Sequence, residues 1–447
     1  MLIVHGNHQG HEFSEPGYAY LGELLASRGY ILTSVDENFL NLDWLGDYQT
    51  AEHPARGWLL LEHLKVWRGW NESKDNPFFR KVDLANIALM GHSRGGEAAA
   101  TAAAFNRLAY YPGDATVRFD YNFAIKSIVA IAPSDGQYKP AGMWRPLRDV
   151  SYLVLYGGHD ADVAYFVGSQ QYKRTSFSQG FPGFKAQLYV YRANHGQFNS
   201  VWGRFDGSPP GGWLLNLKPL IGGEEQRRIS KVYISAFLEA TLRGGRQYIP
   251  MFQDYRRAAA WLPDTVHLNR YQDATFRPVC TYEEDFDVTS TTLPGGAIRG
   301  HNLAVWKEQR IHFRDGSRED NGVYLGWRKP DKKKEEKKGL TKGKEPLDLT
   351  VELIATGGQA VRFPLSRLGP LYAPLTVKQL KIQPPGRSPY GDETEPTLQR
   401  YALSLGALSQ AGKGFNPATV KAIRFVFDRS GEGVVIVDDI GFSQALP

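Results

Sequence analysis

The chain has 447 residues, of which 42% are hydrophobic and 22% are charged, and this indicates a soluble protein of two domains without a membrane span. The net charge of +6 gives no support for nucleic-acid binding, because residues 328–345 carry a net +5 and leave the rest nearly neutral. The single cysteine, Cys280, excludes an intramolecular disulfide and a cysteine-rich metal site.

The first part of the chain alternates strands with helices. Strands are predicted at residues 1–4, 30–35, 86–90, 126–132, 151–156 and 186–191, and helices at 15–28, 55–70, 95–110 and 225–242. Because the strands are apolar throughout, the pattern predicts an α/β domain over residues 1–265, with a doubly wound, mainly parallel sheet covered on both faces. The first strand lacks the basic leader and the length of a signal peptide, and the localisation stays open.

Beyond about residue 265, short runs alternate apolar and polar residues. They lie at residues 310–314, 347–354, 360–364, 400–405, 422–427 and 434–440, between turns rich in Gly, Pro and Asp. No long helix is predicted between residues 281 and 442. The spacing of the short runs therefore predicts an all-β sandwich domain over residues 278–447. The lysine-rich tract at about 328–346 cannot bury enough apolar surface to offset the cost of ordering, which predicts a disordered loop.

A sharp strand-to-helix turn surrounds Ser93. The apolar strand 86–90 runs into the turn 91–96 (Gly-His-Ser-Arg-Gly-Gly), and an alanine-rich helix follows. Such a turn strains the backbone of its central residue, and Gly91 and Gly95 relieve the crowding two positions away. The pattern predicts that Ser93 presents its hydroxyl at a helix N-terminus, where free N–H groups and the helix dipole favour negative charge.

A catalytic serine needs a base, an acid that orients the base, and donors for the oxyanion. In a parallel sheet these groups come from loops at the carboxyl ends of the strands. His195 follows the last of these strands, after a candidate acid, so Ser93, an aspartate and His195 are predicted as nucleophile, acid and base. Two aspartates follow the strand 151–156; the spacing Gly-x-x-Asp favours Asp160, and Asp162 is the alternative acid.

Other predictions concern the surroundings of Ser93. The oxyanion donors are predicted to be the backbone N–H of Arg94 and one from Asn7 or His8. The walls of a substrate pocket are predicted at Leu42, Trp44, Asp135 and the loop 136–146.

These motifs resemble the α/β-hydrolase superfamily over about residues 1–260. The residues that carry the resemblance are His5-Gly6, Gly91–Glu97, Gly157–Asp160 and Ala193–Trp202. The nearest branch is that of the dienelactone hydrolases, platelet-activating-factor acetylhydrolases and polyester-hydrolase-like esterases. The resemblance implies a serine esterase without a cofactor, which cleaves small-molecule or polymeric carboxylic esters through an acyl-enzyme intermediate.

The resemblance also bears on the two ends of the chain. Family members have about two strands ahead of the one that ends in the oxyanion loop, so a sheet lacking its first strands, or residues upstream of Met1, is expected. Residues 280–447, ending in Val437–Phe442, more faintly resemble jelly-roll accessory domains of the carbohydrate-binding kind. This second resemblance implies carbohydrate as a further partner.

Two alternatives stay open, and a third, a metal site, is not favoured. A serine peptidase or amidase would use the same fold and triad. A non-catalytic carbohydrate-binding or adhesion protein could use the same scaffold, with sugar rings stacking on aromatic side chains of the second domain: Trp306, Trp327, Tyr372 and Tyr390. A metal site could draw on histidines near one rim of the sheet: His5, His8, His92, His159 and His195. No metal is predicted, because no pair of these has the i, i+4 spacing of a zinc-binding helix.

Overall fold

The computed structural model describes residues 1–41, 52–164, 166–207, 210–314, 320–328, 346–382, 388, 390–391, 393–396, 398–409 and 414–444. The chain divides into two compact units. The first unit contains residues 1–274 together with Arg314 and residues 376–394, and the second contains residues 275–313, 319–375 and the remainder, each as far as it is described. None of the described helices has the length and apolar character needed to cross a membrane.

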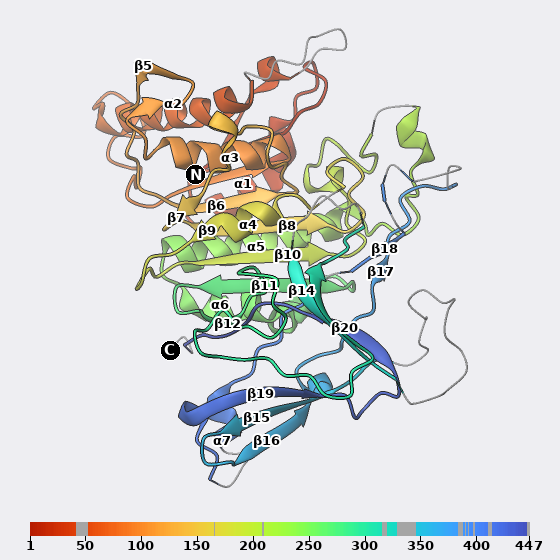
Figure 1. Cartoon of the computed structure of the whole chain (residues 1–447). Helices are drawn as coiled ribbons and strands as arrows, with labels where there is room; N and C mark the ends of the chain where they lie inside the picture. Colours follow the sequence, from red (N-terminus) through yellow and green to blue (C-terminus); the bar gives the residue numbers. More distant parts are fainter. Residues whose placement is uncertain are drawn as a thin grey trace. The chain divides into compact units, whose positions relative to one another are not determined.

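The first unit is built on a seven-stranded sheet (Figure 1). Its strands are β1 (Leu2–Val4), β2 (Thr33–Val35), β3 (Ile87–His92), β6 (Ile125–Ile131), β8 (Ser151–Gly157), β10 (Phe184–Val190) and β11 (His267–Asp273), in the order β11-β10-β8-β6-β3-β1-β2. Neighbouring strands are parallel, except that β11 runs antiparallel to β10. Strands β3, β8 and β10 are buried along their whole length, as a parallel sheet covered on both faces requires.

Helices cover both faces of this sheet. They are α1 (Ala19–Ala26), α2 (Glu52–Glu72), α3 (Arg94–Phe105), α4 (Ser169–Arg174), α5 (Gly223–Leu242) and α6 (Ile249–Gln253). From β1 the chain adds β2 on one side, and after β2 it adds the next strands on the other side of β1. Because crossovers between parallel strands are right-handed, α1 lies on one face of the sheet and α2, α3 and α4 lie on the other. Helix α5 packs against α1 and completes the first face. Two short pairs, β4 (Tyr110–Tyr111) with β5 (Asp114–Arg118) and β7 (Leu147–Arg148) with β9 (Thr175–Ser176), accompany the main sheet.

The second unit consists of small antiparallel sheets. Strand β12 (Arg277–Cys280) pairs with β21 (Ile440–Phe442), β14 (Asn321–Trp327) lies between β13 (Val305–Arg310) and β20 (Gly433–Val437), and β15 (Thr350–Ala355) lies between β16 (Ala360–Pro364) and β19 (Val420–Val426). The short strands β17 (Leu375–Thr376) and β18 (Thr394–Glu395) pair where the chain passes between the units, and α7 (Leu405–Ser409) is a single turn of helix. Buried side chains of β14, β15 and β16 share one apolar core.

Several boundaries differ from those predicted. The first unit continues past residue 265 because β11 pairs with β10 along its whole length. It also takes in the described residues between 376 and 394, which the sequence pattern predicts as part of the sandwich. The strand predicted at 310–314 lies earlier, at Val305–Arg310, where β14 supplies its partner. The alternating run 400–405 forms no strand and leads into α7, since alternation alone supplies no neighbouring strand for the backbone. Residues 329–345 of the charged tract, and Leu42 and Trp44, lie outside the described residues.

Candidate functional site

Ser93 forms the tight turn between β3 and α3. Its backbone has φ 58° and ψ −126°, a strained conformation for a residue with a side chain. A Cβ on Gly91 would lie 1.9 Å from the carbonyl oxygen of Gly95, and a Cβ on Gly95 would lie 2.3 Å from that of Val4. Both positions therefore require glycine, as the sequence pattern predicts.

The loop after β1 lies directly against Ser93. A Cβ on Gly6 would stand 2.4 Å from the Ser93 Cβ, so the predicted oxyanion loop and the predicted nucleophile are in contact. The order of the strands reverses between β1 and β3, and crevices at such switch points are where open α/β sheets bind ligands. Arg94 is the first residue of α3, so its N–H belongs to the helix turn whose donors have no acceptor within the helix. Asn7 is half-buried in the loop beside it.

The side chain of His8, in the predicted oxyanion loop, is held by two hydrogen-bond donors. Its Nε2 lies 2.5 Å from Ser14 Oγ and 3.3 Å from the side-chain nitrogen of Asn41, while Trp202 Nε1 donates to Ser14 Oγ over 2.5 Å. Burial, with a smaller effect from the neighbouring His5, lowers the pKa of His8 to about 4. His8 is thus neutral at pH 7, and its ring shapes the loop without adding charge.

Asp160 and His195 form a buried pair at the same edge of the sheet. Asp160 Oδ2 lies 2.7 Å from His195 Nδ1, and each residue is only 2% exposed. The other carboxylate oxygen of Asp160 accepts hydrogen bonds from the N–H groups of Asp162 (3.0 Å) and Val163 (2.7 Å). The loop therefore wraps around its own carboxylate and aims it at the imidazole.

The two candidate acids lie on opposite sides of the imidazole. Asp162 Oδ2 stands 3.4 Å from His195 Nε2, and its side chain is 51% exposed. Among the described residues Nε2 makes no hydrogen bond. Burial lowers the pKa of His195, but the carboxylates of Asp160 and Asp162 outweigh burial and hold that pKa above its usual value.

Aromatic rings enclose His195. Trp202 stacks parallel to its imidazole, with ring centroids 5.9 Å apart and an interplanar angle of 5°, and the ring of His92 lies 4.7 Å away. Since His92 directly precedes Ser93, this contact brings the predicted base against the strand that carries the predicted nucleophile. His92 is fully buried, and burial lowers its pKa well below the usual value.

Asp206 is a site residue that the sequence analysis missed. Its Oδ2 accepts hydrogen bonds from the N–H groups of Ala161 (3.0 Å) and His195 (2.9 Å), and its Oδ1 from the N–H of Gly196 (2.8 Å) and the side chain of Asn194 (2.6 Å). Burial, together with a neighbouring carboxylate, raises its pKa to about 7. Asp206 thus joins the loop that follows β8 and carries Asp160, here called the acid loop (residues 158–164), to the loop that follows β10 and carries His195. No local sequence motif marks Asp206.

The side chain of Arg94 belongs to a buried ionic network. It pairs with Glu52 at the start of α2. Arg56, which is fully buried, lies 3.3 Å from Glu37 and 3.4 Å from Glu52. Burial raises the pKa of Glu37 to about 8 in spite of this pairing. The network anchors the first turn of α2 beside the predicted oxyanion loop.

Asp135, predicted to lie in the wall of a substrate pocket, has a carboxylate that is engaged by arginines. Its buried carboxylate accepts hydrogen bonds of 2.7 and 2.8 Å from Arg174 and one of 3.4 Å from Arg145. Glu97 in the first turn of α3 accepts from the N–H groups of Gly136 (3.1 Å) and Tyr138 (3.0 Å). Together these contacts hold the loop that follows β6, and the two arginines engage the carboxylate of Asp135 within the protein.

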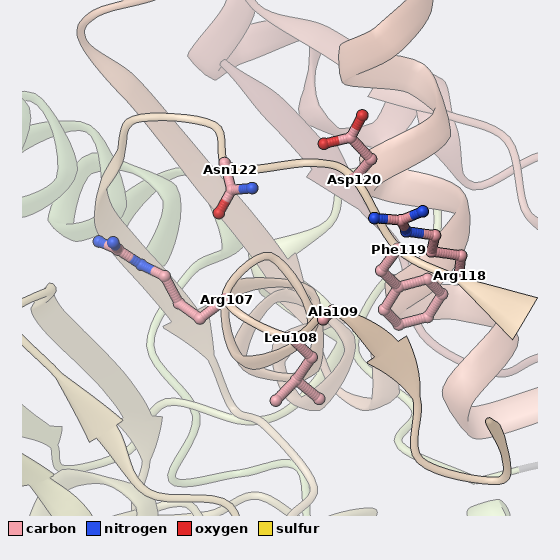
Figure 2. A pocket seen from close by; sticks show the side chains of 7 residues that line it. All are labelled: Arg107, Leu108, Ala109, Arg118, Phe119, Asp120 and Asn122. Carbon is pink, nitrogen blue, oxygen red and sulfur yellow. The ribbon is translucent and has the colours of Figure 1, made fainter.

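A pocket of about 570 Å³ lies elsewhere in the first unit (Figure 2). It is lined by Arg107, Leu108, Ala109, Arg118, Phe119, Asp120 and Asn122. These residues follow the C-terminal end of α3, whose twelve residues span about 18 Å from Ser93. The pocket is therefore separate from the predicted triad.

The described residues contain one grouping with the right atoms for a metal ion, His5, Glu15 and Asp36. Both ring nitrogens of His5 already have partners: Nδ1 lies 2.7 Å from the carbonyl of Gly6, and Nε2 accepts from the N–H of Glu37 over 3.0 Å. His5 thus offers no free nitrogen to an ion.

The two tryptophans considered above as possible sugar platforms both contact the apolar core of the second unit. Trp327 is 6% exposed, stacks on Phe427 with ring centroids 4.5 Å apart, and donates from Nε1 to the carbonyl of Ser430 over 2.8 Å. Trp306 packs against the same core. Trp327 therefore cannot stack on a sugar ring.

Comparison of the sequence with models of known protein families and with curated proteins gives no match to either.

Proposed function

We propose that this protein is a serine hydrolase that cleaves carboxylic esters, with Ser93 as nucleophile, His195 as base and Asp160 as the orienting acid. The observation that carries the proposal is the buried Asp160–His195 contact of 2.7 Å at the edge of the sheet where the strained turn presents Ser93. The order of these residues along the chain and the reversal of strand order beside Ser93 support an α/β-hydrolase fold.

In the proposed reaction, Ser93 Oγ attacks the ester carbonyl carbon while its proton passes to His195 Nε2. The alcohol leaves with that proton, and the acyl group stays on Ser93. Water then gives a proton to His195 and attacks the acyl carbon, and Ser93 regains its proton as the carboxylic acid departs. Asp160 stabilises the imidazolium that forms twice in this cycle.

Negative charge develops on the carbonyl oxygen in both steps. The N–H of Arg94 at the start of α3 and an N–H from the loop of Asn7 and His8 are proposed to donate to it. The contact between Gly6 and Ser93 supports this assignment, because it puts the loop within reach of an acyl group on the serine.

The test uses the full chain and p-nitrophenyl esters of graded acyl length, with an anilide and a peptide measured alongside. We expect ester turnover, covalent labelling of Ser93 by a fluorophosphonate located by mass spectrometry, and loss of both in Ser93→Ala. Faster cleavage of the amide or the peptide would make the protein an amidase or peptidase. A folded protein with neither turnover nor labelling would refute the proposal.

A further inference from the structure

A segment from the C-terminal half of the chain lies against the loop that follows the histidine. Residues 376–382, here called the strap, belong to the first unit. Leu380 forms a bridge with Leu215, the carbonyl of Gln379 accepts from the N–H of Asn216 over 2.7 Å, and the N–H of Lys381 donates to Leu214 over 2.9 Å. These attachments are made by the backbone, so they depend little on the side chains of the strap.

One side chain of the strap reaches the acid loop instead. Gln379 is 6% exposed, and its side-chain nitrogen donates a hydrogen bond of 2.7 Å to the backbone carbonyl of Asp160. Arg314, which is 4% exposed, donates to the carbonyl of Ala164 over 3.0 Å. The acid loop is thus held at Asp160 and at Ala164 by residues that come at least 150 positions later in the chain.

The acid loop needs such support because it has no regular secondary structure between β8 and residue 164. The direction of the Asp160 carboxylate follows from the backbone of this loop, and small errors of placement lower rates strongly in preorganised sites. The buried side-chain amide of Gln379 binds the backbone carbonyl of Asp160 itself, so it fixes the part of the backbone that sets the direction of this carboxylate.

We infer that Gln379 is a positioning residue for the Asp160–His195 pair, so that the strap completes a catalytic unit whose other members all precede residue 210. This inference rests on the proposed function and adds to it that a segment from the C-terminal half of the chain aligns the proposed acid and base.

The experiment compares three variants of the full chain. Gln379→Met keeps the length of the side chain but removes the donor, and Gln379→Glu keeps its size and polarity but turns an oxygen toward the Asp160 carbonyl. Lys381→Met is the control, because its exposed side chain contacts the carbonyl of Trp213 and not the acid loop. Measurements are kcat and KM on a p-nitrophenyl ester, the melting temperature, and the low-field NMR resonance of the His195 Nδ1 proton.

We expect kcat to fall about ten-fold in Gln379→Met and further in Gln379→Glu, with KM within two-fold of the wild type, and the low-field resonance to shift or broaden. Lys381→Met should keep kcat and the resonance. If Gln379→Met does not fold, Gln379→Glu carries the test.

Wild-type kcat and an unchanged resonance in a folded Gln379 variant would overturn the inference. An inactive wild-type protein would refute the proposed function instead, and the resonance would still decide whether Gln379 positions the pair.

Discussion

At the scale of single residues, the imidazole of His195 has one carboxylate on each nitrogen. Asp160 contacts Nδ1 at 2.7 Å and is buried, whereas Asp162 lies 3.4 Å from Nε2 and is half exposed. A serine must approach the imidazole from Nε2, and the orienting acid must bind Nδ1. Within the proposed mechanism, the geometry therefore favours Asp160 as the acid, and Asp162 lies on the Nε2 side of the imidazole.

This assignment predicts unequal effects of two substitutions. Asp160→Asn should lower kcat for ester hydrolysis by about 10⁴ through loss of the correct tautomer of His195, without unfolding the protein. Asp162→Asn should lower kcat by less than about ten-fold, because an exposed carboxylate contributes little. Steady-state kinetics with the melting temperature as control tests both, and the reverse ranking would make Asp162 the acid.

Asp162 should instead affect how kcat/KM for ester hydrolysis depends on pH. Its negative charge helps to hold the pKa of His195 above the usual value. Asp162→Asn removes this charge and lowers that pKa, so the neutral imidazole that acts as base persists to lower pH. We expect the acid limb of the kcat/KM profile to move to lower pH, and a limb that stays in place or moves upward would contradict this.

At the scale of elements, the β3–Ser93–α3 turn leaves no room for side chains beside it. A Cβ on Gly91 would stand 1.9 Å from a backbone oxygen of the following helix, and backbone cannot give way as a flexible side chain can. The two elements are thus packed against each other so closely that the strained conformation of Ser93 is enforced.

Gly91→Ala should therefore destabilise the protein by about 3 kcal/mol or more and abolish labelling of Ser93. Gly69 on α2 is the matched control, because a Cβ there meets nothing within 4 Å. Gly69→Ala should stabilise the protein by about 0.5–1 kcal/mol, as alanine does in a helix interior. Urea unfolding measures both changes. Equal stability of the two variants would show that the turn is less crowded than described.

At the scale of the whole molecule, the first unit is discontinuous in sequence. A protein ending at Ala274 would keep all seven strands and the proposed triad, but it would lack Arg314 and Gln379. If residues 1–274 were a self-sufficient catalytic domain, the protein ending at Ala274 would keep its activity. The acid loop, however, would lose both distant hydrogen bonds.

We expect the protein ending at Ala274 to have a kcat at least about ten-fold below that of the full chain, and a lower melting temperature, because buried groups lose their partners. Circular dichroism shows whether it folds, and active-site titration counts the competent sites. A folded protein with the full kcat would show that the strap is dispensable.

Much of the first unit is determined by the sequence itself. The apolar strands and the helices between them follow from local periodicity, and the Gly-x-Ser-x-Gly turn carries a local residue pattern, since Gly91 is required by its contact with Gly95 four positions later. The position of the candidate site could be predicted as well, because parallel strands bring their carboxyl ends, and with them Ser93, Asp160 and His195, to one edge of the sheet.

Only the tertiary structure decided the rest, because it depends on contacts between distant parts of the chain. Asp206 joins two loops through backbone N–H groups, and Gln379 reaches a carbonyl 219 positions earlier. Any residue offers an N–H or a carbonyl, so such contacts leave no pattern of residue types in the sequence. The strand partners of the second unit are decided in the same way, because alternation sets which face of a strand is buried but not which strand lies beside it.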